Sequence, residues 1–178
     1  MKPKKDTKNY TDTFQHKDNS PLSIEMQPIG IVYSPFKERF TAPRQPGSTP
    51  TKGRIELNGG LNFEQALADL DRFTHIWVIY WMHLNQGWNP TVMPPRGSDI
   101  RRGLFSTRAP HRPNSMGLSV VTLTSIKKRT LFIEGLDMLD GTPVLDIKPY
   151  LPYADSIKNA SHGWLDPNLP FTFSSTSK

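Results

Sequence analysis

The sequence predicts a mainly β domain, either a barrel or a sandwich, on three observations. Seven segments have the β-branched composition or the alternation that is typical of strands, whereas one segment has a clear helical periodicity. The 178 residues include 17 prolines and 12 glycines, which favours many turns and argues against a helical bundle. A chain of this length holds one domain with a proper core more comfortably than two.

The expected strands cover residues 28–36, 53–58, 74–83, 104–107, 117–126, 130–135 and 144–148. The run from Thr74 to His83 is apolar and aromatic almost throughout, so we expect it to be buried on both faces or nearly so. The basic turn Lys127–Arg129 lies between two strand patterns, and this arrangement predicts a β-hairpin.

One short helix is expected over residues 63–70, with Asn62 as its N-cap. Its apolar residues at 63, 66, 67 and 70 follow the spacing of a single buried helix face. Residues 37–52 and 85–103 are interrupted by proline and glycine and predict long loops. The polar residues 1–23 predict a mobile basic tail, and residues 159–178 predict a segment that wraps the surface or is disordered.

The net charge of +6 is concentrated in one part of the chain. Residues 96–129 contain eight Lys or Arg and one acid, Asp99, whereas the rest of the chain has 14 bases and 15 acids. A local excess of positive charge suits a polyanion such as nucleic acid. A solvated basic face that maintains solubility is the alternative interpretation.

Several classes of protein are disfavoured. The chain has no cysteine, no Gly-x-Ser-x-Gly elbow and no phosphate-binding glycine motif. His75 and His83 would lie about 26 Å apart on one strand, so they cannot share a metal, and no metal site is expected. Asp137, Asp140 and Asp146 each have a simple structural use, which disfavours a paired-carboxylate hydrolase.

The longest apolar run, Ile76–Met82, has seven residues and is far too short to cross a bilayer. No apolar segment follows the basic N-terminus, so a secretory signal is not expected. The absence of cysteine fits a reducing compartment. Together these features predict a cytoplasmic protein with no membrane partner.

Three segments share a character that suits a small polar ligand: Pro43–Gln45, Arg108–Ser119 and Asp140–Pro143. Each combines rigid turns with backbone donors and a few directional side chains. The central one contains two arginines and a histidine and leads directly into an apolar strand, an arrangement that presents binding groups from a fixed scaffold. A plain surface connection and a plain β-turn are the alternatives for the second and third segments.

The chain resembles the TsaA, or TrmO-like, family of S-adenosylmethionine-dependent methyltransferases. The matching blocks are residues 28–36, 42–45, 107–114, 117–119, 135–137, 139–150 and 152–155, and they occur in the family's order over roughly residues 28–166. The resemblance implies a single β-barrel domain over residues 24–158, with about seven strands, one short helix and long loops. It also implies a homodimer.

The resemblance further implies N6-methylation of threonylcarbamoyladenosine next to the anticodon of tRNA, with S-adenosyl-L-methionine as the cofactor. The implied cofactor contacts are Pro43, Arg44, Gln45, His83, Leu84, Arg108, Leu118, Asp140, Gly141, Thr142 and Pro143. Ser115-Met116 departs mildly from the family, which often has Pro-Ile there.

The candidates for holding the substrate's phosphate or carboxylate are Arg112, Asn114 and Lys148, with packing and turn support as the alternative for Arg112 and Lys148. The acceptor nitrogen must also lose a proton, and no catalytic group is identified for this step. Asp140 is a candidate within the protein, although a cofactor hydroxyl would also suit it as a partner; the carboxylate of the substrate is another candidate.

The well-known bacterial enzymes of the family carry a further C-terminal domain, whereas this chain stops shortly after Asp166. Two alternative functions therefore stay open. One is methyl transfer to a different acceptor, and the other is a non-catalytic regulatory module that binds S-adenosylmethionine.

Overall fold

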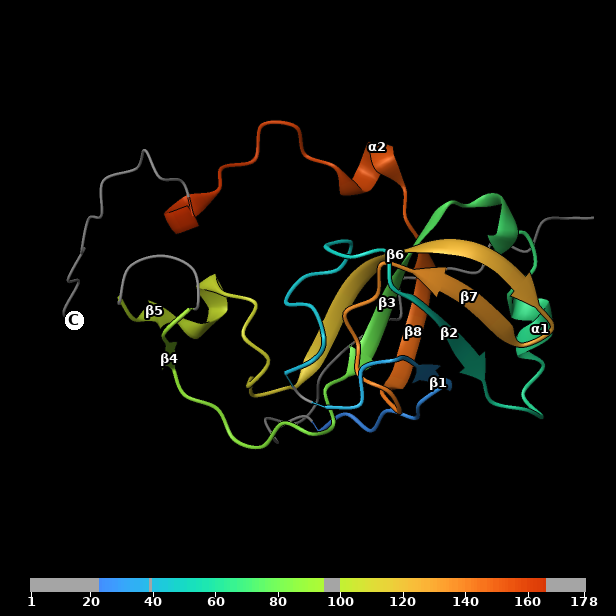
Figure 1. Ribbon diagram of the computed structural model, residues 1–178, viewed down its shortest axis with the longest axis horizontal. Coiled ribbons are helices and arrows are strands. Elements are labelled where there is room, and N and C mark those ends of the chain that lie inside the picture. Colours follow the sequence, from blue (N-terminus) through green and yellow to red (C-terminus); the bar gives the residue numbers. More distant parts are fainter. Residues whose placement is uncertain (1–22, 39, 95–99, 166–178) are drawn as a thin grey trace, which may run out of the picture.

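The computed structural model describes residues 23–38, 40–94 and 100–165, and its centre is a closed antiparallel barrel (Figure 1). The barrel strands are β1 (Gly30–Tyr33), β2 (Lys52–Leu57), β3 (His75–Trp81), β6 (Met116–Lys127), β7 (Thr130–Glu134) and β8 (Pro143–Pro149). Their order around the barrel is β1-β2-β7-β6-β3-β8, and a short pairing of β1 with β8 closes it. The expected mainly β barrel is confirmed, with six strands in the barrel itself.

The remaining elements are short. They are β4 (Thr91–Val92), β5 (Arg102–Gly103), α1 (Phe63–Ala66), α2 (Pro152–Asp155) and the 3₁₀ helices η2 (Leu70–Arg72), η3 (Leu104–Ser106) and η4 (Gly163–Leu165). Strands β4 and β5 form a separate two-stranded sheet, which Figure 1 shows to one side of the barrel.

The core lies inside the barrel because alternate residues of each strand point inward. On β3 these residues are Ile76, Val78 and Tyr80, each no more than 9% exposed. Leu136 and Met138, which follow β7, are also buried and belong to the same core cluster.

Three connections share that end. Neighbouring barrel strands all run antiparallel, so the loops 34–51, 82–115 and 135–142 all leave the barrel at the same end. We call this the loop end. The hairpin turn between β6 and β7 and the connection from β2 to β3 lie at the opposite end. The three segments expected to bind a ligand are thus carried to the loop end by the topology.

The expected hairpin is confirmed, since Lys127 pairs with Thr130 across its turn. The strand expected over residues 104–107 is wrong, because this segment forms η3. The Ser106 hydroxyl donates to the Gly103 carbonyl, and the Thr107 hydroxyl donates to the Leu104 carbonyl. Such local side-chain bonds compete with sheet pairing.

The expected helix is also shorter than predicted. α1 ends at Ala66, and Asp69 adopts a left-handed conformation with φ of 63° before η2 begins. Asn62 occupies the N-cap position, but it has φ of 55° and its side chain bonds Gln65 instead of a backbone amide. The apolar residues still face the core despite this break, because Leu67 is buried and Phe63 packs against the core.

The expectation that β3 is buried on both faces is wrong. Its outer residues are only partly covered: Trp77 and Ile79 are half-buried, whereas Trp81 is 47% exposed. A barrel has one dry interior, so apolar side chains on its outer face remain available for contacts.

The expected tails lie mostly outside the described residues, and the division at residues 23 and 158 stays a prediction. Within the described part, Trp164 donates its indole N–H to the Ser106 carbonyl at 2.7 Å, and the Arg102 guanidinium lies 5.1 Å from the Trp164 ring centroid. No helix among the described residues has both the length and the apolar character needed to span a bilayer.

Candidate ligand-binding site

The three loops at the loop end are tied to one another and to the barrel. Arg108 Nη1 donates to Gln45 Oε1 at 3.1 Å, which joins the loops 82–115 and 34–51. The Gly47 amide donates to the Gly135 carbonyl at 2.8 Å, which joins the loops 34–51 and 135–142. These contacts link segments that are far apart in the sequence, as a preorganised binding site requires.

A cleft of about 490 Å³ begins at these loops and extends over the outer face of β3 and β6. Its lining residues are Gln45, Pro46, His75, Trp77, Arg108, Leu118, Val120, Tyr150 and Asp155. Gln45, Arg108 and Leu118 belong to the set that the family resemblance assigns to the cofactor. This volume lies within the usual range of small-molecule sites.

The wall of the cleft away from the loops is aromatic, and we call His75, Trp77 and Tyr150 the aromatic wall. The Trp77 and Tyr150 ring centroids are 5.8 Å apart, and those of His75 and Tyr150 are 6.3 Å apart. The Trp77 indole N–H donates to Asp155 Oδ2 at 3.0 Å, and the same oxygen accepts the Leu151 amide at 2.7 Å. The orientation of the Trp77 ring is thereby fixed by the chain that follows β8.

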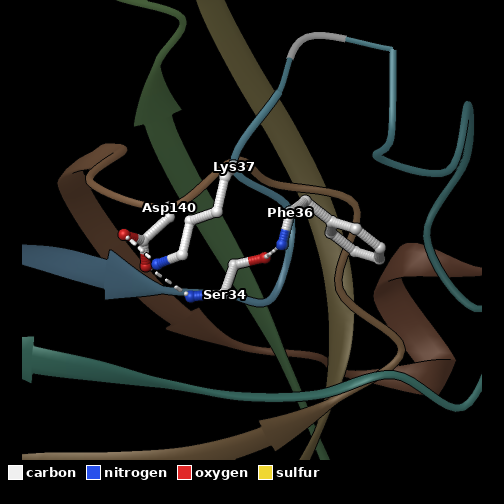
Figure 2. Close-up of polar contacts among 4 residues, drawn as sticks. All are labelled: Ser34, Phe36, Lys37 and Asp140. Carbon is white, nitrogen blue, oxygen red and sulfur yellow. Dashed lines mark hydrogen bonds and ion pairs between the residues drawn. The ribbon is translucent and has the colours of Figure 1, made fainter.

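Asp140 lies in a different hollow. Its Oδ1 accepts the Ser34 amide at 2.9 Å and its Oδ2 contacts Lys37 Nζ at 2.6 Å, as Figure 2 shows. The hollow has about 410 Å³ and is lined by residues of β1, β2 and β7, including Tyr33, Arg54 and Phe132. The ion pair with Lys37, helped by the Ser34 amide, lowers the pKa of Asp140 below its usual value.

The residues assigned to the cofactor therefore do not meet in one pocket of the single chain. Leu118 is on the outer face of β6, whereas Asp140 lies beside β1, and these strands are opposite each other in the barrel order. Thr142 is buried and its carbonyl accepts the Val32 amide, so the 140–143 turn belongs to the β1 side. Pro43 and Arg44 precede Gln45 in its loop, and His83 and Leu84 follow β3 at the loop end.

Of the candidates for substrate contact, Arg112 and Asn114 share the 82–115 loop, whereas Lys148 lies on β8. Arg112 Nη1 donates to the Thr107 carbonyl at 3.0 Å, which supports the loop. Asn114 accepts the Met116 amide through its backbone carbonyl. Lys148 lies on the outside of β8 and pairs with Asp146 at 2.7 Å. The contact of Arg112 fits the packing and turn role, and substrate contact by these three residues stays a prediction.

The basic segment is divided between two regions. Arg101, Arg102, Arg108 and Arg112 belong to the long 82–115 connection, but Lys127–Arg129 forms the hairpin turn at the opposite end. Arg129 is also engaged, because it pairs with Glu64 at 3.2 Å and donates to the Leu57 carbonyl. The positive charge of residues 96–129 is therefore not gathered in one place, since β6, a strand of twelve residues, separates the two groups.

One buried polar network in the structure is not indicated by the sequence. Ser119 points into the barrel and donates its hydroxyl to Asp137 Oδ1 at 2.7 Å, and the Tyr80 hydroxyl lies 3.3 Å from Ser119 Oγ. Burial raises the pKa of Tyr80 to about 12, and the charge of Asp137 adds to this effect. Burial also raises the pKa of Asp137, although the Ser119 hydrogen bond and the nearby Arg108 charge oppose the rise.

Replacing Asp137 by Asn is expected to change how stability depends on pH. A carboxyl whose pKa is raised by folding contributes stability below its unfolded pKa, and this contribution is lost as the pH rises through the folded pKa. Asn keeps an acceptor for Ser119 and cannot ionise. The free energy of unfolding of Asp137→Asn relative to the original chain should thus increase from acid to neutral pH. Urea denaturation across this range measures it, and parallel pH profiles would contradict the raised pKa.

Metal ligation finds no support in the part of the chain that the structure describes. No group of three or more His, Cys, Asp or Glu side chains within residues 23–38, 40–94 and 100–165 is placed to hold an ion. His75 Nδ1 lies 2.9 Å from the Thr74 hydroxyl, and its ring packs against Tyr150, so it belongs to the aromatic wall.

Comparison with known proteins gives the same family by three routes. The family model described as the tRNA-methyltransferase O N-terminal domain matches residues 31–156. The tRNA (adenine(37)-N6)-methyltransferase of Escherichia coli is 42% identical over 147 residues, covering 78% of this chain and 63% of that protein. A probable S-adenosyl-L-methionine-binding protein of Pyrococcus abyssi is 41% identical over 150 residues, covering 84% of this chain and 80% of the relative.

The crystal structure of TrmO from Pseudomonas aeruginosa superimposes with a TM-score of 0.70 at 39% identity, covering 84% of this chain and 66% of that one. The chain thus spans just under two thirds of the length of the Escherichia coli enzyme and of the crystallised protein. The family model covers all of the barrel except Gly30, together with the loops at its loop end. This chain therefore belongs to the family of the tRNA-methyltransferase O N-terminal domain.

Proposed function

We propose that this protein is an S-adenosylmethionine-dependent methyltransferase that methylates N6 of threonylcarbamoyladenosine next to the anticodon of tRNA, in the cytoplasm. The observation that carries the proposal is the cleft at the loop end, where Gln45 meets Arg108 and Leu118 although it lies 63 residues before Arg108 in the sequence. Two relatives that match most of this chain are named tRNA (adenine(37)-N6)-methyltransferase, which supports methylation of this kind.

The cleft has groups that suit the cofactor. The Arg108 guanidinium is matched to a carboxylate, such as that of the methionyl end of the cofactor. Gln45 offers amide hydrogens from a position fixed by its bond to Arg108, and Leu118 supplies an apolar surface that is 55% exposed. When bound, the cofactor supplies a methyl group activated on a positively charged sulfur.

The protein's contribution to the chemistry is alignment and exclusion of water. Attack of the acceptor nitrogen forms an N–C bond while the S–C bond breaks, and the nitrogen loses its proton. Holding the two reacting groups in line accounts for a large part of such a rate. Both carboxylate oxygens of Asp140 are engaged, one by the Lys37 ammonium and the other by the Ser34 amide, so the proposed mechanism leaves the proton to the carboxylate of the substrate itself.

We further propose that the working unit is a homodimer whose cofactor site draws residues from both copies. The Asp140–Pro143 turn and the cleft of one chain lie on opposite sides of the barrel, so a second copy is needed for both to contact one cofactor. Trp81 and Met116 beside the cleft are 47% and 43% exposed, and a partner would cover them. Light scattering should give twice the chain mass of 20.2 kDa; a monomer mass would contradict this part.

The activity itself is tested with labelled S-adenosylmethionine and tRNA from a strain that makes threonylcarbamoyladenosine but lacks its N6-methyl form. Transfer of the label to that nucleoside, identified by mass spectrometry after digestion, is the expected result. Transfer to another RNA or protein would favour the alternative acceptor. Cofactor binding without transfer to any acceptor would favour a regulatory binding module.

A further inference from the structure

We propose that the aromatic wall of the cleft is the subsite that binds the adenine base of the acceptor RNA by stacking. The inference rests on the proposed function and adds to it a place for the acceptor, formed by Trp77, Tyr150 and His75. The residues assigned to the cofactor do not include these three.

The first argument is the shared cleft. Methyl transfer requires the acceptor nitrogen to lie about 3 Å from the methyl carbon, so the cofactor and the acceptor base must occupy one continuous space. Gln45, Arg108 and Leu118 line the part of the cleft next to the loops. Apart from Pro46, beside Gln45, and Val120, which follows Leu118 on the outer face of β6, the rest of the lining consists of the aromatic wall and Asp155. A base bound there would face a cofactor held by Arg108.

The second argument is the state of the aromatic side chains. They lie outside the barrel, so the core does not need them, and both Trp77 and Tyr150 are only half-buried. The position of the Trp77 ring is nevertheless fixed. The Asp155 carboxylate holds the Trp77 indole at 3.0 Å and the Leu151 amide at 2.7 Å. An ordered and partly exposed aromatic surface is what stacking on a base requires.

The third argument concerns which ligand fits. The cleft combines aromatic faces with a guanidinium at one end and a carboxylate at the other, namely Arg108 and Asp155. In the proposed function Arg108 holds the carboxylate of the cofactor, so the groups left for the acceptor are the aromatic faces and Asp155, whose carboxylate accepts hydrogens from amino or hydroxyl groups. Lys148 is the cross-strand neighbour of Trp77 on β8, and its ion pair with Asp146 lies beside the wall. An RNA nucleotide matches this set.

The test measures binding of an anticodon stem–loop RNA and methyl transfer to tRNA for Trp77→Ala, Trp77→Phe and Trp88→Ala. Trp77→Ala should weaken RNA binding about tenfold and raise KM for tRNA by a similar factor, with unchanged affinity for S-adenosylmethionine. Trp77→Phe keeps a ring and loses the hydrogen bond to Asp155, so it separates stacking from structural support and should retain most of the affinity. Trp88 is 50% exposed and outside the cleft, and its replacement should change neither value.

The outcomes separate this inference from the proposed function. Methyl transfer to tRNA with an unchanged KM in Trp77→Ala would overturn the subsite and leave the function standing. RNA binding that depends on Trp77, without methyl transfer by the original chain, would overturn the function and leave the subsite standing. A loss in Trp77→Phe as large as that in Trp77→Ala, or an equal loss in Trp88→Ala, would also overturn the subsite.

Discussion

Arg108→Ala is expected to weaken binding of S-adenosylmethionine by about 10- to 150-fold. Hydrogen bonds to a charged group contribute roughly 1.5–3 kcal/mol, and each 1.4 kcal/mol is a factor of ten in affinity. Arg108 also holds Gln45 at 3.1 Å, so its removal would release a second cleft residue. Isothermal titration calorimetry with the purified protein measures this change directly.

Two variants serve as controls for this result. Arg108→Lys keeps the charge but loses the planar fork, so its affinity should fall between those of the original chain and Arg108→Ala. Arg72→Ala removes an arginine that is 82% exposed, outside the cleft and paired only loosely with Asp69 at 3.7 Å, and should leave affinity unchanged. Arg108 is exposed, so the thermal midpoint of its variants without ligand should stay close to that of the original chain. If Arg108→Ala and the original chain had equal affinity for S-adenosylmethionine, Arg108 would not be part of the cofactor site.

The strands of the barrel could be predicted because their patterns of polarity are long and the segments that flank them indicate the same structure. Residues 117–126 and 130–135 alternate in polarity and flank a short basic turn, and the hairpin follows. The segment 104–107 has the same local composition, but it forms η3 because its hydroxyls bond nearby carbonyls. Local composition alone cannot decide between these two outcomes.

Local composition also cannot decide which distant segments of the candidate site share a pocket. The three loop segments could be chosen from their polar, rigid character, and the antiparallel order of the strands brings them to one end. Which of them share a pocket depends on the barrel order, and this places Asp140 away from Leu118. The aromatic run 74–83 did contain a signal for the aromatic wall. Its even-numbered residues point into the barrel and its odd-numbered residues point outward. This division becomes apparent only when the strand is known to belong to a closed barrel.

The Asp137–Ser119–Tyr80 network lacked any sequence signal of this kind. Ser119 is 1% exposed and lies between apolar residues of β6, so its pattern reads as a small core residue. Its partners come from β3 and from the loop after β7, at sequence separations of 39 and 18. Contacts of this length are set by the closure of the barrel, and local pattern carries no information about them.

Gly117→Ala is expected to destabilise the fold by about 1–3 kcal/mol or more, the usual cost of overpacking a filled core. Gly117 points into the barrel from β6, opposite Tyr80 on β3. A Cβ at this position would lie 2.2 Å from two carbons of the Tyr80 ring, a distance that side chains do not tolerate. The ring is enclosed by the core, so it can move away only by displacing its neighbours. The free energy of unfolding in urea measures the effect.

A double-mutant cycle with Tyr80→Leu identifies the cause. If the clash with the ring is responsible, Gly117→Ala should cost less in the Tyr80→Leu background, with a coupling of about 0.5–3 kcal/mol. Gly103→Ala is the matched control, because a Cβ there meets nothing within 4 Å and its φ of −57° suits alanine. Additive effects in the cycle would show that Tyr80 is not the obstacle. Gly117 is also the neighbour of Leu118 on β6, so cofactor affinity in the single variant shows whether the cleft depends on the packing inside the barrel.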